Sequence, residues 1–254
     1  MVSITLSFKP RQVTKRLTST LPERAREVLF SRFGLNDDAE QRTLENIGEK
    51  YGITRERVRQ IESFALGSIK KSSVYGEEQK SFAELKEAII RLGGIISEDE
   101  LLSHFAKDQL TQNHIHFFLV LHDDFVKHKE DDHFKHRWGV DKETSGCVHE
   151  SLKKLYESLS DEDLILEEDI INKFLVHLKD VAGQYKNEEI LKRWLSISKK
   201  IGKNPLGEWG KTEAPSVRTR GIKDYAFLIL RRHKKPMHFT EVAAEIKKTF
   251  GKNA

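Results

Sequence analysis

The fold is decided by the stretch RTLENIGEKYGITRERVRQIE, residues 42–62 of this chain of 254 residues. Its apolar residues Leu44, Ile47 and Tyr51 recur at intervals of three and four, which predicts one face of a helix. Gly52 follows and has the backbone freedom that a tight turn between helices needs. We therefore predict a short helix, a glycine turn and a second helix.

The second predicted helix begins after Thr54, whose hydroxyl can cap a helix N-terminus. Val58, Ile61 and Ala65 form its predicted buried face. The other face carries side chains that can read bases, since Arg can bind guanine, Gln can bind adenine and Glu can accept from the cytosine amino group. Recognition helices read bases mainly with their N-terminal residues. The residues on this face are Arg55, Glu56, Arg59 and Gln60.

An ordinary solvated pair of amphipathic helices is the alternative interpretation, because charged helix faces usually only contact water. Three features argue against it: the turn glycine, the N-cap, and a mixed set of Arg, Glu and Gln within one and a half turns. These features favour a helix pair that reads the DNA major groove.

Four runs of sequence share their order and spacing with a known family. They are LPERAREVL at 21–29, RFGL at 32–35, TLE at 43–45 and YGITRERVRQIE at 51–62. Together they resemble region 4 of the primary-type bacterial sigma factors, with a short insert at 36–41 where that family carries a variable loop. The resemblance covers residues 15–72.

This resemblance implies recognition of a promoter −35-like element in double-stranded DNA. By position, Arg55, Glu56 and Gln60 correspond to the base-reading residues of the family. Phosphate-side contacts are implied for four further residues, and Thr43 completes the predicted DNA-binding set. The four are Arg42, Thr54, Arg57 and Arg59.

The resemblance also makes the core RNA polymerase a candidate partner. In that family the preceding helices, here residues 22–33, dock on the flap of the polymerase β subunit. The sequence itself shows only that Val28, Leu29 and Phe33 make an apolar stripe. Packing inside a small domain explains that stripe equally well.

A complete sigma factor also carries an aromatic-rich region, usually before region 4, that melts the −10 element. Here only about twenty residues precede the first matching run at 21–29, and they contain one aromatic residue, Phe8. We therefore expect a DNA-reading module without the melting module.

Composition places the protein among intracellular proteins with several small domains. Charged residues make up 33% of the chain, which is typical of several small helical units. The single cysteine, Cys147, excludes an intramolecular disulfide and fits a reducing cytoplasm. No apolar run approaches the roughly 20 residues of a membrane span, and residues 1–20 lack a signal-peptide core. We expect a bacterial cytoplasmic protein associated with the nucleoid.

Charge is distributed unevenly along the chain. Residues 1–75 carry 14 Lys and Arg against 9 Asp and Glu, residues 76–200 carry 18 against 26, and residues 201–254 carry 12 against 5. The two basic ends can neutralise DNA phosphates, whereas a duplex would repel the acidic middle. The middle is therefore either a solvated spacer or a surface for a basic protein partner.

Residues 82–140 have the predicted element order of a winged helix. Phe125, Phe134 and Trp138 are expected to anchor its hairpin, and Ser97 is expected to cap its second helix. The order is helix, short strand, two helices and hairpin, at 82–92, 95–96, 97–105, 111–120 and 125–140.

A similar order recurs twice. The second helices of the three units begin at Ser97, Glu167 and Thr240, which are 70 and 73 residues apart, and this regular spacing predicts tandem winged-helix-like units. The second unit has predicted helices at 148–159, 167–178 and 188–198, an extended piece at 164–166 and a reduced wing at 205–209. The third has predicted helices at 221–233 and 240–250 around an extended piece at 236–239.

The third unit carries a second resemblance. The runs RGIKDYA at 220–226 and KPMHFTEVA at 235–243 resemble the opening of a HARE-HTH domain, a winged-helix family that includes the N-terminal domain of the RNA polymerase delta subunit. The resemblance covers residues 220–254 and implies a third helix and a wing. We therefore expect a truncated chain or an incomplete domain.

The predicted fold class is mainly α. A helix-turn-helix domain at 1–75 is followed by tandem winged-helix-like units with small β-hairpins, at 78–141, 147–212 and 219–254.

Histidines are concentrated in the middle of the chain, where nine of the eleven lie between positions 104 and 177. His128, His133 and His136, beside Asp131 and Asp132, could converge on zinc or another transition metal. Exposed polar positions on a wing explain them more simply.

Other catalytic signals are weak. The carboxylates Asp123, Asp124 and Glu130 stand near lysines, but their spacing does not fit a metal-dependent nuclease. Glycines 93 and 94 are typical of a helix end rather than of a phosphate-binding loop. We predict a protein that is not an enzyme and has neither a metal nor a cofactor.

Three functions remain open. The first is a transcription factor like sigma region 4 that binds −35-type DNA and contacts RNA polymerase. The second is a free-standing repressor or nucleoid-type DNA-binding protein that does not associate with polymerase. The third is a regulatory protein whose acidic middle binds a partner. Nothing in the sequence identifies the target site, the direction of regulation or the oligomeric state.

Overall fold

The computed structural model describes residues 5–178, 181 and 183–253. It is mainly helical with small antiparallel sheets, which confirms the predicted fold class. The chain divides into two compact units. The first contains the described residues up to His128 together with His136–Lys142, and the second contains Lys129–Lys135 and the residues from Glu143 onward.

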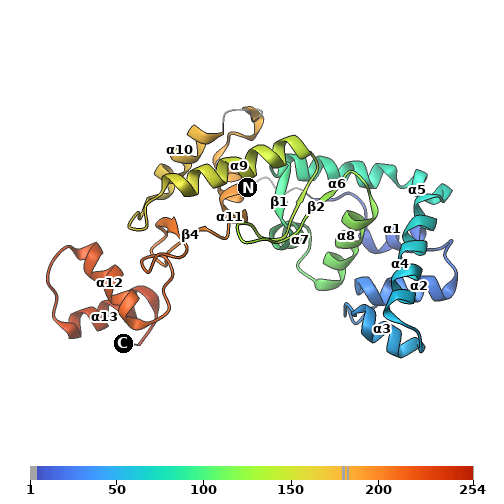
Figure 1. Cartoon of the computed structure of the whole chain (residues 1–254), viewed down its shortest axis with the longest axis horizontal. Helices are drawn as coiled ribbons and strands as arrows, with labels where there is room; N and C mark the ends of the chain where they lie inside the picture. The colour runs from blue at the N-terminus through green and yellow to red at the C-terminus, as the bar shows by residue number, and fades with distance from the viewer. Residues whose placement is uncertain (1–4, 179–180, 182, 254) are drawn as a thin grey trace. The chain divides into compact units, whose positions relative to one another are not determined.

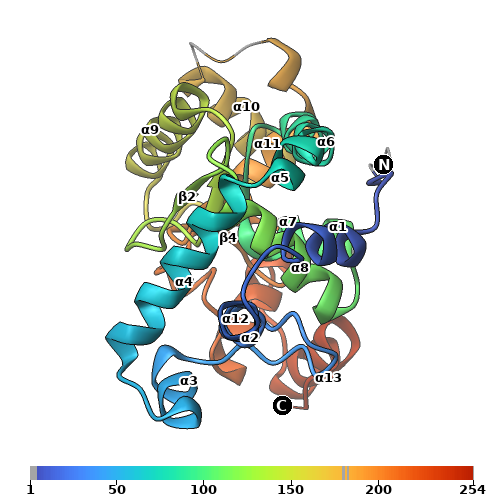
Figure 2. The ribbon, with the colours of Figure 1, turned by 90° about the vertical axis from the view of Figure 1, so that its right-hand side faces the viewer.

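The first unit begins with helices α1 to α4, and Figures 1 and 2 show α3 joined to α4 through a tight turn. Glycines at the C-terminal ends of α2 and α3 adopt the left-handed conformation that ends a helix, with φ of 62° at Gly34 and 63° at Gly52. The helices are α1 (Pro10–Leu17), α2 (Glu23–Phe33), α3 (Leu44–Tyr51) and α4 (Arg55–Lys70).

The rest of the first unit follows the predicted order of helix, strand, two helices and hairpin. In its sheet, β3 is central and pairs antiparallel with both β1 and β2, so that Trp138 lies opposite Ile96 and Lys127. The elements are α5 (Ser73–Glu77), α6 (Gln79–Arg91), β1 (Ile95–Ser97), α7 (Glu98–Phe105), α8 (Gln109–Leu121), β2 (Val126–His128) and β3 (Arg137–Gly139).

The predicted start of the second helix at 97–100 is confirmed, since Glu98, Asp99 and Glu100 lie in the first turn of α7. Ser97 occupies the N-cap position of α7, but its side chain makes no capping hydrogen bond. The residue is also the last of β1, where it pairs with Arg137.

One hydrophobic core runs through the first unit. It joins Leu17 of α1 and Leu29 of α2 to Phe82 of α6, Phe117 of α8 and Trp138 of β3. The predicted boundary between 1–75 and 78–141 stays a prediction, and residues from both sides of it share this core. The packing of α8 against α1 and α2 brings them together.

The second unit contains a helical part followed by a short hairpin. In the predicted extended piece at 164–166, Ile165 pairs with Trp209. The predicted reduced wing at 205–209 forms most of the turn between β4 and β5, and its last residue, Trp209, begins β5. The elements are α9 (Lys142–Ser158), α10 (Glu167–His177), η1 (Gly183–Tyr185), α11 (Glu188–Ile197), β4 (Ile201–Lys203) and β5 (Trp209–Lys211).

Phe134 does not anchor the hairpin of the first unit as predicted. It belongs to the second unit, where its backbone bridges to Ser198 and its ring lies 4.8 Å from that of His149. The reason is that β2 and β3 are only three residues long, so the connection beyond them pairs elsewhere. Lys135 N accordingly donates to Ile197 O at 3.0 Å.

The chain continues into α12 (Ile222–His233) and α13 (Phe239–Phe250). Ile229, Val242 and Ile246 form a small core between these two helices. Helix α13 begins at Phe239 after an N-cap at His238, one residue before the predicted start, and the Phe239 side chain is 75% exposed. Within the described ranges, no helix has both the length and the apolar character needed to cross a membrane.

Candidate nucleic-acid interface

The turn between α3 and α4 is built as the sequence predicts. Gly52 has a φ of 63°, and a Cβ atom on Gly48 would lie 2.6 Å from the carbonyl oxygen of Ile53, so both positions require glycine. The hydroxyl of Thr54 accepts a hydrogen bond from Arg57 N at 3.2 Å, which caps α4. These contacts fix the direction in which α4 leaves the turn.

The inner faces of α3 and α4 pack on α2. Ile47 and Val58 are buried and form a cluster with Val28 of α2. Val58 is buried as predicted, whereas Ile61 is only partly buried. The Tyr51 hydroxyl donates to Glu27 of α2 at 2.8 Å, and it adds a polar contact at the edge of this cluster.

The outer face of α4 contains six of the eight predicted DNA-binding residues, all exposed within its N-cap and first turn and a half. Arg42 and Thr43 lie in the segment before α3, where Thr43 caps that helix through Asn46 N at 3.2 Å. Arg42 is partly buried beside Asp38 and Glu40, at 3.5 and 3.4 Å. The six on α4 are Thr54, Arg55, Glu56, Arg57, Arg59 and Gln60.

The charged side chains on α4 pair with one another. Arg59 donates two hydrogen bonds to Glu56, at 2.9 and 2.7 Å, which lower the pKa of Glu56 and raise the pKa of Arg59. Arg57 donates to the Gln60 side chain at 3.0 Å. Because all these side chains are exposed, their pairs contribute little to stability and can be exchanged for contacts with a ligand.

Arg55 has a partner that sequence reasoning missed. Its guanidinium lies 3.9 Å from the Glu45 carboxylate of α3. The two residues are ten positions apart, so helix periodicity could not reveal the contact. Glu45 thus places negative charge beside a predicted base-reading residue.

The sequence-based metal and nuclease candidates are not assembled into a site. Among the described residues, no three His, Cys, Asp or Glu side chains are placed to hold a metal ion. The three carboxylates considered for a nuclease each pair with a different lysine. Asp123 contacts Lys70 at 2.5 Å, Asp124 contacts Lys86 at 2.9 Å, and Glu130 contacts Lys199 at 2.7 Å.

Comparison with known proteins identifies the segment that carries this interface. Residues 19–71 match the family "Sigma-70, region 4". The RNA polymerase sigma factor RpoD of Helicobacter pylori is 46% identical over 65 residues, which are 26% of this chain and 10% of that protein. SigA of a Bacillus species is 54% identical over 54 residues (21% and 14%), and SigA of Listeria monocytogenes is 48% identical over 65 residues (26% and 17%).

The chain thus spans only 10 to 17% of the length of these relatives. No solved structure matches it. Residues 19–71, which contain α2, α3 and α4, are a DNA-binding helix-turn-helix segment like sigma-70 region 4.

Proposed function

We propose that this protein recognises a promoter −35-like element with the N-terminal turns of α4. Arg55, Glu56 and Gln60 read base edges in the major groove. Five other residues hold the flanking phosphates, and they are Arg42, Thr43, Thr54, Arg57 and Arg59. The observation that carries the proposal is the contiguous exposed set on α4 within the segment that matches sigma-70 region 4.

The geometry supports an exchange of partners on binding. Glu56 is held by Arg59, so this ion pair must open or rotate before the Glu56 carboxylate can accept from a cytosine amino group. Arg59 is then released toward a phosphate, and the N-terminal end of α4 adds its positive dipole. In a similar exchange, Gln60 turns from Arg57 to a base, and Arg57 is then free to contact a phosphate.

Contact with RNA polymerase is the less supported part of this proposal. The apolar stripe of α2 that the sigma resemblance assigns to the polymerase flap is buried: Val28 and Leu29 are 0% exposed and Phe33 is 5% exposed. The ring of Phe33 packs edge-on against Phe117 of α8 at 5.3 Å. This observation favours the second candidate function, a free-standing DNA-binding regulator. Co-purification with core RNA polymerase separates the two.

We propose the following roles for the rest of the chain. Residues 78–141 and 147–212 are winged-helix-like units, and residues 219–254 are a HARE-HTH-like part whose basic character suits an acidic partner. The whole acts as a non-catalytic bacterial regulator at the nucleoid in the cytoplasm.

Selection of bound duplexes from a random pool at near-physiological salt tests the proposal. We expect enrichment of a TTGACA-like element. Arg55→Ala and Gln60→Ala should each lose about 1–3 kcal/mol of discrimination between that element and a version changed at the contacted base. Arg91→Ala, which removes an exposed arginine at the end of α6, is the control and should bind like the wild type. Binding without sequence preference, equal in all variants, would contradict the assignment.

A further inference from the structure

A pocket of about 560 Å³ lies where α1, α2 and α8 meet the loop that follows α2. This volume is within the range of small-molecule sites. Arg11 and Lys15 of α1, Arg26 of α2 and His114 of α8 line it, and none of them belongs to the proposed DNA-reading set.

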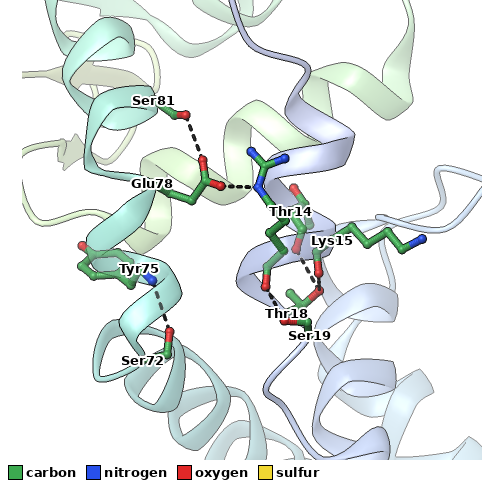
Figure 3. A network of polar contacts seen from close by, with 9 residues as sticks. Thr14, Lys15, Thr18, Ser19, Ser72, Tyr75, Glu78 and Ser81 are labelled. Atoms are coloured by element: carbon green, nitrogen blue, oxygen red, sulfur yellow. Dashed lines mark hydrogen bonds and ion pairs between the residues drawn. The ribbon is translucent and has the colours of Figure 1, made fainter.

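The pocket carries cations that the protein leaves unpaired. Arg11 is neutralised by Asp37 at 2.7 Å. Lys15 and Arg26 form no ion pair with any residue in the described part of the chain. Figure 3 shows the Lys15 side chain pointing away from Glu78, which is bonded to the neighbouring Arg16. Two positive charges are therefore available to an anionic ligand.

A buried histidine adds a second, independent observation. His114 is 2% exposed, and its Nδ1 lies 2.9 Å from the Thr14 hydroxyl oxygen. Its Nε2 is buried and has no hydrogen-bond partner among the described residues. Buried polar atoms are rarely left unpaired in folded proteins. This nitrogen is also closed to a molecule of water size, so a ligand atom reaches it only after the ring or its neighbours shift.

The charge state of His114 follows from its surroundings. Burial, and to a lesser extent the charge of Arg11, lower the pKa of His114 to about 4, while Asp108 opposes them. The ring is therefore neutral at pH 7. If the Thr14 hydroxyl donates to Nδ1, Nε2 carries the proton, and the neutral ring adds no charge to the pocket.

One wall of the pocket is apolar. Phe30 is partly buried and Leu35 is buried, and both line the pocket together with the charged residues. We propose that the pocket binds a small phosphate-bearing ligand of the nucleoside phosphate class, with its phosphate at Lys15 and Arg26 and its ring against Phe30. Such a ligand would bridge α1, α2 and α8.

Calorimetric titration of the full chain with ADP, inorganic phosphate and adenosine tests this site. We expect saturable binding of ADP, weaker binding of phosphate and none of adenosine. Lys15→Ala and Arg26→Ala should each weaken ADP binding about ten-fold, the loss expected for one charge-assisted contact. Lys107→Ala, which removes an exposed lysine outside the pocket, should bind ADP like the wild type.

Thermal unfolding of each variant establishes that it is folded, and a shift of the His114 ring resonances on ADP addition, with those of His122 unchanged, would place the ligand in the pocket. The proposal is overturned if neither ADP nor phosphate binds, or if both alanine variants bind ADP as well as Lys107→Ala does. It is also overturned if these variants weaken only duplex DNA, because the cations would then serve the DNA backbone. The selection experiment on α4 is independent of all these outcomes.

Discussion

Helices α4 and α8 each follow a shorter helix in the chain, yet they expose opposite kinds of surface. The first turns of α4 are exposed and charged around a single buried residue, Val58. Helix α8, the third helix in the winged-helix order, buries Ile115, Phe117 and Phe118 in the core of the first unit. The order of elements therefore does not determine which helix presents a charged surface, whereas the pattern of apolar residues along each helix does.

The amino-acid sequences of α4 and α8 explain why their surfaces differ. Residues 55–60 contain one apolar side chain, that of Val58, so the first turns of α4 lie on the surface with only this residue buried. Residues 115–121, IHFFLVL, are apolar almost all round, and a helix of this kind must be covered by other elements. Here α1 and α2 provide the cover. The same contact buries Phe33 of the apolar stripe of α2 against Phe117, whereas Val28 of that stripe is buried against α3 and α4.

The largest expected effect on stability is for a substitution in the buried helix α8. Phe117 is 0% exposed, and its ring packs against Phe33 across α8 and α2. Phe117→Ala should lower the free energy of unfolding by about 3–5 kcal/mol, because it leaves a cavity in the shared core. Urea unfolding followed by circular dichroism measures the loss.

Phe64→Ala on α4 is the matched control, since that phenylalanine is 58% exposed. Its effect should stay within about 0.5 kcal/mol. If Phe117→Ala also cost so little, α8 would not be holding the first unit together, and the contrast between the two helices would fail.

The local features of α3, α4 and the turn between them could be predicted from the sequence. Gly52 and Thr54 act through neighbours only a few positions away, so their roles as turn and cap were predicted and are confirmed. The exposed set on α4 followed from the period of Val58 and Ala65. The assignment of these residues to bases and phosphates stays a prediction.

Contacts between distant segments could not be predicted. Asn113 bonds to the loop after α2, 79 positions from Gly34, and no periodic pattern encodes such a pairing. Phe134 fits the alternating pattern of a hairpin, but β2 ends at His128 and β3 begins only at Arg137, so Phe134 lies outside both strands. The pocket at Lys15, Arg26 and His114 was missed for the same reason, because its lining comes from three helices and a loop.

Asn113 of α8 holds the loop that follows α2 through hydrogen bonds, and its loss should have the next largest effect. Its side-chain amide donates to the carbonyl oxygens of Gly34 and Ala39 at 2.8 and 2.9 Å, and its oxygen accepts from Gln41 and Gln109, both at 2.9 Å. Asn113→Ala should lower the free energy of unfolding by about 1–3 kcal/mol, because buried carbonyl groups lose their partners. Hydrogen exchange should quicken in the loop at 35–42.

Gln112→Ala on the same helix removes one hydrogen bond, to Ala106 O at 2.9 Å, and is the control. It should leave exchange in that loop unchanged. Equal exchange in the wild type and in Asn113→Ala would show that α8 does not hold the loop that leads into α3 and α4.

The smallest expected effect is on the pH dependence of stability, and it compares two glutamates that each pair with an arginine. Glu78 has a side chain that is 9% exposed and is bonded to Arg16 and Ser81, whereas Glu56 on α4 is 57% exposed and is bonded to Arg59. The hydrogen bond from Arg16 lowers the pKa of Glu78 below its ordinary value of 4.5. The folded protein therefore binds this proton less readily than the unfolded chain, and stability rises with pH wherever the unfolded chain binds more protons.

The contribution of Glu78 is thus complete above about pH 4.5 and is lost as pH falls through the lowered pKa. Glu78→Gln should lower the free energy of unfolding at pH 7 by about 1 kcal/mol, and the difference from the wild type should shrink on acidification below that pH. Urea unfolding of both proteins at a series of pH values measures this difference in the free energy of unfolding. Glu56→Gln should show no such gap at any pH, because solvent screens its exposed pair. A gap of equal size in both variants would mean that the pair on α4 is as structural as the one on α1, and that α4 is less free to exchange its partners for DNA.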